Sequence, residues 1–363
     1  MTGESHRVAL CPHFSVEHFR GGEKWVVTLA NYLVQHTDAE VAIHAYPYAP
    51  NGTRRVSVED VLDERIEYTE RWRHDLSGVD TAYVFYHPGA RLSFPRANQY
   101  IAGIHSWAYI SQRLYEPHYG LVPTAVKTLY KFVGSRDLRW YDLVHTVTPA
   151  FGVDHPGLVT IPNFVDTDIF HPTTGTPDSE FTVLVTAAHI PEKGWDFVER
   201  VAEQLPNEIR VCATGEVSHP DITGLGFLSE TELAAAYARS HVVFHPSRVD
   251  TDSMVINESC ASATPIVTSP IPTHIRENAG VLHAGTVQEM RYCLEKLYRE
   301  WSDAPELYES RCKAAHQSVR GHESQTVFPQ LQAMLTGEQP PMTGNRQATT
   351  TDSTFVSPIS NDY

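Results

Sequence analysis

Residues 172–177 read Pro-Thr-Thr-Gly-Thr-Pro, and one pattern of secondary structure ends before this stretch and begins again after it. On both sides, short runs rich in β-branched and aromatic residues alternate with amphipathic helical runs. Strands that alternate with helices along a chain pair in parallel, so each half is expected to form an open sheet covered by helices. The Pro, Gly and Thr composition of the stretch is typical of a linker between two such units.

Hydrophobic periodicity predicts the elements of each unit. The first half is expected to contain strands at Val8–Leu10, Val41–Tyr46, Thr81–Phe85 and Leu143–Val147 and a helix at Glu23–Gln35. The second half is expected to contain strands at Thr182–Thr186, Arg210–Thr214, Val242–Phe244 and Pro265–Thr268 and helices at Asp196–Gln204, Glu230–Ala238 and near Val255–Ala261. Ligands of such sheets bind beyond the carboxyl ends of the strands, so we expect the site in the loops that follow strands.

The composition excludes several classes of protein. The 363 residues, 41% of them hydrophobic, are enough for two domains with their own cores. The five cysteines are scattered without a CxxC pair, which favours reduced thiols and a cytoplasmic location over structural zinc. The formal net charge of −16 argues against a nucleic-acid partner, because phosphate binding needs an excess of cations. We expect neither a membrane span nor a signal peptide.

Two loops of the first half carry candidate site residues. Gly21 and Gly22 end the loop after the first strand, where paired glycines permit a close backbone approach and the free N–H groups of a helix start attract anions. His105 follows an apolar stretch at the end of a second loop. For Gly21 and Gly22 the alternative is a flexible loop before a helix, and for His105 it is a structural histidine.

Two loops of the second half are more informative. Lys193 lies in Pro-Glu-Lys-Gly between a strand and a helix, where it can reach a phosphate without crossing a core; a solvated lysine is the alternative. Farther on, Ser253 or Asp252 is expected to cap a helix whose positive end would favour a diphosphate. Glu258 lies in an apolar part of that helix, a costly place for a carboxylate unless hydroxyls such as those of a ribose donate to it. The alternative is a surface glutamate.

The order of these motifs resembles the retaining glycosyltransferases of the GT-B fold, family four in the sugar-transferase classification, over roughly residues 7 to 335. The matching stretches are Gly21-Gly22-Glu23, Gly103-Ile-His105, Ile161-Pro-Asn163-Phe-Val-Asp166-Thr-Asp-Ile-Phe170-His-Pro172, Pro191-Glu-Lys193-Gly194, Pro246-Ser247, the acids Asp250 and Glu258, and Ala263-Thr264-Pro265.

The resemblance implies an α/β fold of GT-B type, in which two Rossmann-like doubly wound domains face each other across a cleft. Residues 1–170 would form the acceptor domain and residues 171–320 the nucleotide-sugar donor domain. A helix at 321–336 would pack back on the first domain. Residues 337–363 are rich in Pro, Gly, Ser and Thr and are predicted to form a disordered tail.

Carried over residue by residue, the resemblance also implies roles. Lys193 would contact the donor diphosphate, Glu258 the ribose and Asp250 the hydroxyls of the transferred sugar. His105 would lie beside the anomeric carbon, and Gly22, with Gly21, would let backbone N–H groups approach phosphate or acceptor. Ser253 would also belong to the donor site. The leaving phosphate would accept the proton of the acceptor, so neither a metal nor another cofactor is expected.

Three positions depart from the family pattern. Asp250 replaces a glutamate, Asp252-Ser253 replaces Phe-Gly, and Ala188 replaces an arginine five residues before the phosphate lysine. Losing one contact to a developing charge costs on the order of 10²-fold in rate. Either another basic residue takes over, with Arg248 the nearest candidate for donor binding, or the activity is reduced.

The implied function is transfer of a sugar from a nucleotide-sugar donor to a hydroxyl of a glycan, lipid-linked or small-molecule acceptor, in surface glycan, glycoprotein or glycolipid synthesis. The alternatives are a nucleotide-sugar epimerase and a catalytically weakened homologue that acts as a binding or scaffold subunit. The basic residues of a predicted helix at Pro123–Trp140 also indicate peripheral contact with the inner face of a membrane; a helix packed on the core is the alternative.

Overall fold

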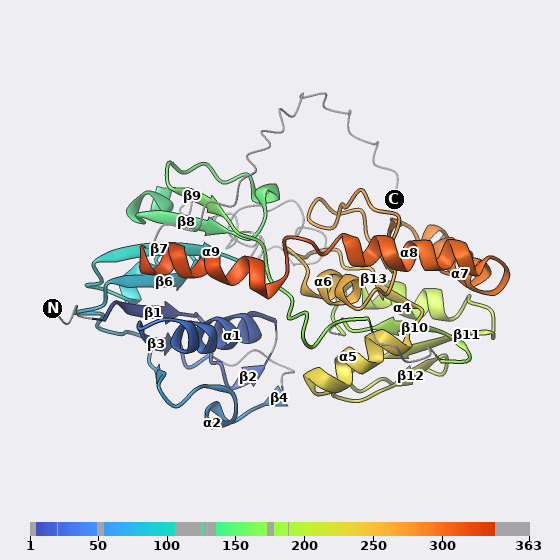
Figure 1. Ribbon diagram of the computed structural model, residues 1–363, viewed down its shortest axis with the longest axis horizontal. Coiled ribbons are helices and arrows are strands. Elements are labelled where there is room, and N and C mark those ends of the chain that lie inside the picture. Colours follow the sequence, from blue (N-terminus) through green and yellow to red (C-terminus); the bar gives the residue numbers. More distant parts are fainter. Residues whose placement is uncertain are drawn as a thin grey trace.

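The computed structural model describes residues 5–19, 21–48, 54–105, 125, 129, 136–172, 178–187 and 189–337. They form two α/β lobes that lie side by side along the long axis of the molecule (Figure 1). Four regions singled out from the sequence lie wholly or mostly outside the described residues: the linker at 173–177, Ala188, the tail after residue 337 and the predicted helix Pro123–Trp140.

The N-terminal lobe is built on a parallel sheet of seven strands in the order β5-β3-β1-β6-β7-β8-β9. In chain order these are β1 (Arg7–Cys11), β3 (Glu40–Ala45), β5 (Glu67–Glu70), β6 (Thr81–Phe85), β7 (Gln99–Ile104), β8 (Leu143–Thr146) and β9 (Leu158–Thr160). Helix α1 (Gly21–His36) buries Trp25, Leu29 and Leu33 in the core of this lobe. A short antiparallel pair, β2 (His18–Phe19) with β4 (Arg54–Arg55), and helix α2 (Val58–Val61) complete it.

The C-terminal lobe repeats this design with a parallel sheet of six strands in the order β12-β11-β10-β13-β14-β15. The strands are β10 (Phe181–Val185), β11 (Ile209–Ala213), β12 (Ile222–Gly224), β13 (Val242–His245), β14 (Ile266–Thr268) and β15 (Val281–His283). The helices are α4 (Trp195–Ala202), α5 (Glu230–Arg239), α6 (Met254–Ala261), α7 (Val287–Asp303) and α8 (Pro305–Gln317). The predicted fold of two doubly wound parallel units is therefore confirmed.

The last helix, α9 (Ser324–Thr336), returns from the C-terminal lobe to the N-terminal one (Figure 1). Its residues Val327, Phe328, Leu331 and Leu335 join the same core cluster as α1. The chain crosses between the lobes at two places that are hydrogen-bonded together, because the backbone of Val165 bonds to residues 322 and 324.

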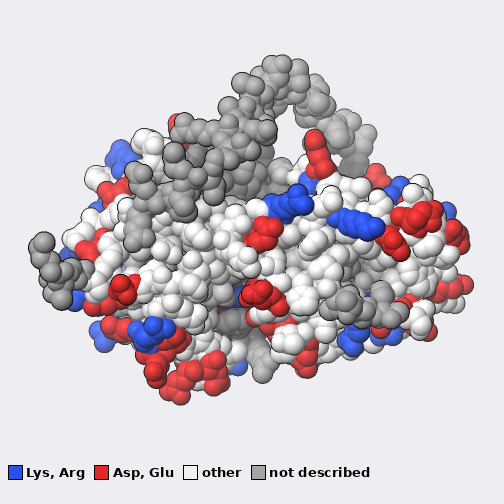
Figure 2. Space-filling model, in the orientation of Figure 1, with Lys and Arg blue, Asp and Glu red and all other residues white. Residues whose placement is uncertain are grey.

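Charge is distributed over both lobes, and acidic side chains stand out on the face shown in Figure 2. This distribution fits the net charge of −16. Within the described residues, no helix combines the length and the apolar character needed to cross a membrane.

We predict that Leu331→Ala lowers the free energy of unfolding by about 2–5 kcal/mol, because it leaves a cavity in the core under α9. Leu331 is 0% exposed. Urea denaturation of this variant and of Gln325→Ala, an exposed position on the same helix, measures the difference. Equal stability of the two variants would mean that α9 does not stabilise the N-terminal lobe.

Candidate active site

Lys193 is held at the carboxyl end of β10 by a close contact between two loops. It ends the 3-10 turn Pro191–Lys193, and the next residue, Gly194, has φ of +71°. A Cβ atom on Gly194 would lie 2.0 Å from the carbonyl oxygen of Pro246, so only glycine allows this approach. The backbone N–H groups of Arg248 and Val249 donate to the carbonyl oxygen of Glu192 and complete the contact.

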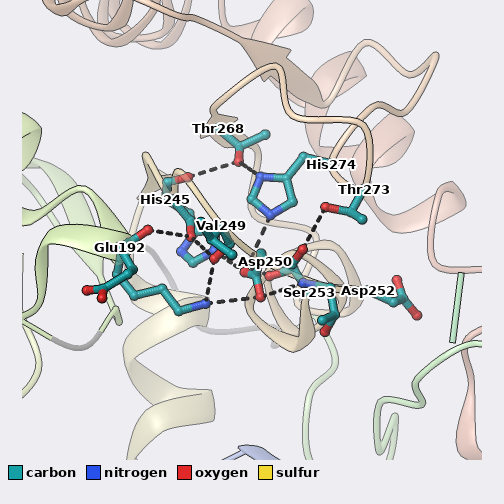
Figure 3. A network of polar contacts seen from close by, with 12 residues as sticks. Glu192, His245, Val249, Asp250, Asp252, Ser253, Thr268, Thr273 and His274 are labelled. Carbon is teal, nitrogen blue, oxygen red and sulfur yellow. Dashed lines mark hydrogen bonds and ion pairs between the residues drawn. The ribbon is translucent and has the colours of Figure 1, made fainter. Parts of the chain in front are cut away.

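This contact brings Lys193 to Asp250, which follows β13. The Lys193 ammonium lies 3.0 Å from Asp250 Oδ1, while His245 Nε2 lies 2.8 Å and His274 Nε2 3.4 Å from Oδ2 (Figure 3). Burial alone would raise the pKa of Asp250, but Lys193 and the two imidazoles outweigh it and hold the pKa well below its usual range. Asp250 is therefore a buried carboxylate that stays charged.

The two imidazoles are themselves fixed by neighbouring strands. His245 ends β13 and Thr268 ends β14, and these residues are register partners in the sheet. The Thr268 hydroxyl lies 2.7 Å from His274 Nδ1 and 2.9 Å from the carbonyl oxygen of His245. Burial lowers the pKa of His245 to about 4, so that ring is neutral near pH 7.

His245, Asp250 and His274 are also the set of described residues that could hold a metal ion, since their ligand atoms lie within 4.8 Å of one another. His and carboxylate ligands suit several divalent cations. However, the Lys193 ammonium already lies against Asp250. Repulsion between this ammonium and a divalent cation would weaken metal binding at the set.

Glu258 is the second buried carboxylate, on α6, with 8% of its side chain exposed. Tyr237 OH donates to Oε2 at 3.1 Å, and Lys24 of the other lobe approaches Oε1 at 3.1 Å. Lys24 also forms an ion pair with Glu230. The sequence interpretation missed Lys24 and Tyr237; the only signal was that Lys24 lies two residues after Gly22, at a helix start.

Two predicted residues of this loop have other contacts. Ser253 is the N-cap residue of α6, but its side chain makes no capping hydrogen bond; its hydroxyl lies 3.4 Å from His245 Nε2. The side-chain cap expected at Ser253 is therefore wrong. Asp252 accepts a hydrogen bond from the backbone N–H of Asn163 at 2.7 Å, and the Asn163 amide donates to the Asp252 carbonyl oxygen. This residue thus joins the two lobes.

The guanidinium of Arg248 is directed away from Lys193 and Asp250 and pairs with Asp196. It also donates to the carbonyl oxygen of Pro191 and stacks on the ring of Phe197 at 4.1 Å. These contacts occupy the side chain that the sequence suggested as a replacement for the missing arginine at position 188.

In the N-terminal lobe, His105 ends a buried hydrogen-bond chain. His145 Nε2 can only donate to the carbonyl oxygen of Ile161, at 2.8 Å, so its Nδ1 accepts from Tyr83 OH at 2.5 Å. The Tyr83 oxygen, 2.7 Å from His105 Nε2, then accepts from that nitrogen. Burial, followed by His145 and His13, holds the pKa of His105 well below its usual range. The neutral His105 ring therefore keeps a free acceptor at Nδ1.

Glycines make room for this chain and for a cavity beside it. A Cβ atom on Gly103 would lie 2.3 Å from the Tyr83 ring, so the phenol reaches His105 only because residue 103 is glycine. The cavity, of about 150 Å³, is lined by His13, Phe14, Gly22, Phe85, Tyr86, Gly103 and His105. Gly21 lies at the lobe boundary, where an added Cβ would meet the sulfur of Met254 at 3.4 Å.

The structure thus brings Lys193 to Asp250, and Glu258 to the start of α1. His105 and Gly22 border the cavity in the N-terminal lobe. Val249, next to Asp250, is buried in a hydrophobic cluster of the N-terminal lobe, so the Asp250 loop lies where the two lobes meet. One wall offers an ammonium and two carboxylates, and the other offers neutral imidazole. Such a site suits a ligand that carries both an anionic group and hydroxyls.

Comparisons with known proteins agree with this arrangement. Residues 181–300 match the family model described as "Glycosyl transferases group 1". A search of curated proteins finds no match.

Among solved structures, the chain resembles sucrose-phosphate synthase from Thermosynechococcus elongatus with a TM-score of 0.72 at 15% identity, over 91% of this chain and 98% of that one. It resembles Anabaena Alr3699/HepE in complex with UDP-glucose with a TM-score of 0.66 at 13% identity, over 91% and 99%. WaaG, a glycosyltransferase involved in lipopolysaccharide biosynthesis, gives 0.66 at 11% identity, over 91% and 100%. The protein therefore has the two-domain GT-B fold, and its residues 181–300 match the model of the group 1 glycosyltransferases.

Proposed function

We propose that the protein transfers a sugar from a nucleoside-diphosphate sugar to an acceptor hydroxyl, with retention of configuration at the anomeric carbon. The observation that carries the proposal is the partly buried pair of Lys193 and Asp250 at the carboxyl ends of β10 and β13, next to Glu258 on the helix that follows Asp250. These residues fall within the segment that matches the glycosyltransferase family model. Anabaena HepE, which shares the fold, has been seen with UDP-glucose.

In this proposal the donor diphosphate takes Lys193 from Asp250. A phosphate oxygen is a strong acceptor for an ammonium, and charge builds up on the leaving diphosphate during transfer. Asp250 would keep the His245 Nε2–H on Oδ2, and its Oδ1, which also accepts from the Thr251 N–H at 3.0 Å, would exchange the ammonium for a sugar hydroxyl. When Lys193 moves to the diphosphate, it would therefore leave a position on Asp250 for a sugar hydroxyl.

The N-terminal lobe would contribute His105 as a hydrogen-bond acceptor. Its Nδ1 is free because the chain from Ile161 through His145 and Tyr83 fixes the proton on Nε2. A neutral imidazole beside the reacting carbon would orient a sugar hydroxyl without repelling the positive charge that develops on the sugar ring. The proton of the acceptor would pass to the leaving phosphate, so transfer on the same face needs no separate protein base.

We further propose a place for the enzyme in surface glycan, glycoprotein or glycolipid synthesis, with a glycan, lipid-linked or small-molecule acceptor. The rival proposal, a binding or scaffold subunit, draws on Ala188 and on the altered Asp250-Thr-Asp-Ser253 loop. The contact of Asp252 with Asn163 gives that alteration a structural reason and so weakens the argument for lost activity. Measuring the release of nucleoside diphosphate from a panel of donors distinguishes the enzyme from the subunit. If the protein binds a donor but releases no nucleoside diphosphate with any acceptor, only the binding or scaffold subunit remains.

We predict that Lys193→Ala and Glu258→Gln each raise the donor Kd, by about tenfold or more, because each removes a charge-assisted hydrogen bond. Calorimetric titration with UDP, GDP and their sugars measures this. Glu208→Gln, an exposed position in the same lobe, serves as the matched control. If all three variants bind as tightly as the unaltered protein, the donor lies elsewhere.

We also predict that Tyr83→Phe lowers kcat about tenfold or more with a smaller effect on donor KM. Without the phenol, the His105 Nε2–H loses its acceptor and the proton is no longer fixed on that nitrogen. Steady-state kinetics measures the split between kcat and KM. Tyr141→Phe, which removes another largely buried phenol of this lobe, controls for general loss of packing. An unchanged kcat in Tyr83→Phe would exclude His105 as an oriented acceptor.

A further inference from the structure

Lys24 is a cation of the N-terminal lobe that lies against the carboxylates of the C-terminal lobe. Its ammonium contacts Glu258 Oε1 at 3.1 Å and forms a second ion pair with Glu230, and 14% of its side chain is exposed. It also lies over the ring of Phe170, 4.8 Å from the ring centre. Burial alone would lower the pKa of Lys24, but the charges of Glu258 and Glu230 outweigh it and raise the pKa. Lys24 is therefore charged near pH 7.

In this arrangement both oxygens of Glu258 have partners. Tyr237 OH donates to Oε2 and also lies 3.1 Å from the hydroxyl of Thr186, deep in the C-terminal lobe where Tyr237 is 0% exposed. Oε1 faces the N-terminal lobe and carries Lys24. Tyr237 belongs to the packed core and cannot withdraw, whereas Lys24 has a flexible stem. A ligand that binds Glu258 through a pair of hydroxyls would displace Lys24.

We propose that Lys24 is a donor-site residue supplied by the opposite lobe: it pairs with Glu258 at the position that the ribose would take, and it leaves this carboxylate when a nucleoside diphosphate binds. The proposal rests on the assignment of the ribose to Glu258. It explains how a carboxylate with only 8% exposure remains paired when no ligand is present.

Glu230 makes this exchange feasible. It lies in the first turn of α5, its side chain is 38% exposed, and it pairs with the same ammonium. When the ribose hydroxyls take over Glu258, Lys24 keeps Glu230 as a partner and is not left as an unpaired charge. Because Lys24 belongs to α1 and both acids belong to the other lobe, nucleotide binding breaks a contact between the lobes.

The test compares nucleotide binding by Lys24→Met with that of the unaltered protein. Methionine keeps the apolar stem and removes the competing charge, so the Kd for UDP or GDP in calorimetric titration is expected to fall about tenfold. Lys313→Met, an exposed lysine on α8, is the matched control and is expected to leave the Kd unchanged. A Kd that stays the same or rises in Lys24→Met would overturn the proposal, since Lys24 would then be neutral or a direct donor contact.

Two further measurements separate this proposal from the ribose assignment. In a Glu258→Gln background, Lys24→Met is expected to give no further tightening. If Glu258→Gln alone leaves the Kd unchanged, the ribose assignment fails. If it raises the Kd while Lys24→Met does not lower it, only the Lys24 proposal fails. Without any nucleotide, amide hydrogen exchange in α5 and α6 is expected to be faster in Lys24→Met, and unchanged exchange would contradict a contact that holds the lobes together.

Discussion

A carboxylate removed from water has to be paired, and this constraint shapes the region where the two lobes meet. Asp250 and Glu258 are both largely buried, and each is paired with a lysine: Lys193 from the same lobe and Lys24 from the other. Each carboxylate also holds a neutral partner, an imidazole in one case and a phenol in the other. Within the protein, each carboxylate thus occupies a lysine that a phosphate could bind, and each lysine occupies a carboxylate that ligand hydroxyls could bind.

The same constraint accounts for residues that carry no chemistry themselves. Gly194 allows the Lys193 turn to touch the Pro246 loop, and Gly103 allows Tyr83 to reach His105. Asp252 occupies a position where the family pattern has an apolar residue, yet it is buried because the Asn163 N–H donates to it and His322 lies 3.4 Å away. Asn163 and His322 come from the two crossings between the lobes. Asp252, which departs from the family pattern, therefore connects the two crossings between the lobes.

Much of this architecture could be predicted from the sequence. Strands with long apolar runs, such as β6, and amphipathic helices, such as α1, were predicted with the right type and nearly the right ends, because their periodicity is determined locally. Length alone does not explain the strands that were missed: β9, β12 and β15 have three residues, as the predicted β14 does, and the missed β7 has six. The turn that carries Lys193 and the loop that leads into the helix of Glu258 could be identified because they follow strong strands.

The pairing of charges could not be predicted, and the reason is physical. The contact of Lys24 with Glu258 spans 234 residues of sequence, and nothing in the local pattern of either residue specifies a partner in the other lobe. His274 likewise lies in an irregular loop, and it reaches Asp250 only because β13 and β14 end side by side. The pairing of Arg248 with Asp196 could not be predicted for the same reason, since it depends on how α4 packs.

The two walls of the cleft differ in a way that follows from these pairings. The C-terminal wall is charged and can exchange one partner for another, because an ammonium moves easily between carboxylate and phosphate oxygens. The N-terminal wall adds the ammonium of Lys24 beside a chain of neutral groups in which every proton from Ile161 to His105 has one place. Because a lysine ammonium can change partners, the donor would bind by exchange of ion pairs. Because the proton of His105 is fixed on Nε2, its Nδ1 would accept from the sugar and hold it in one orientation. The different roles of the lobes thus follow from which groups each lobe buries. The hydrogen-bond chain that ends at His105 can remain unchanged while the ion pairs, including that of Lys24, rearrange.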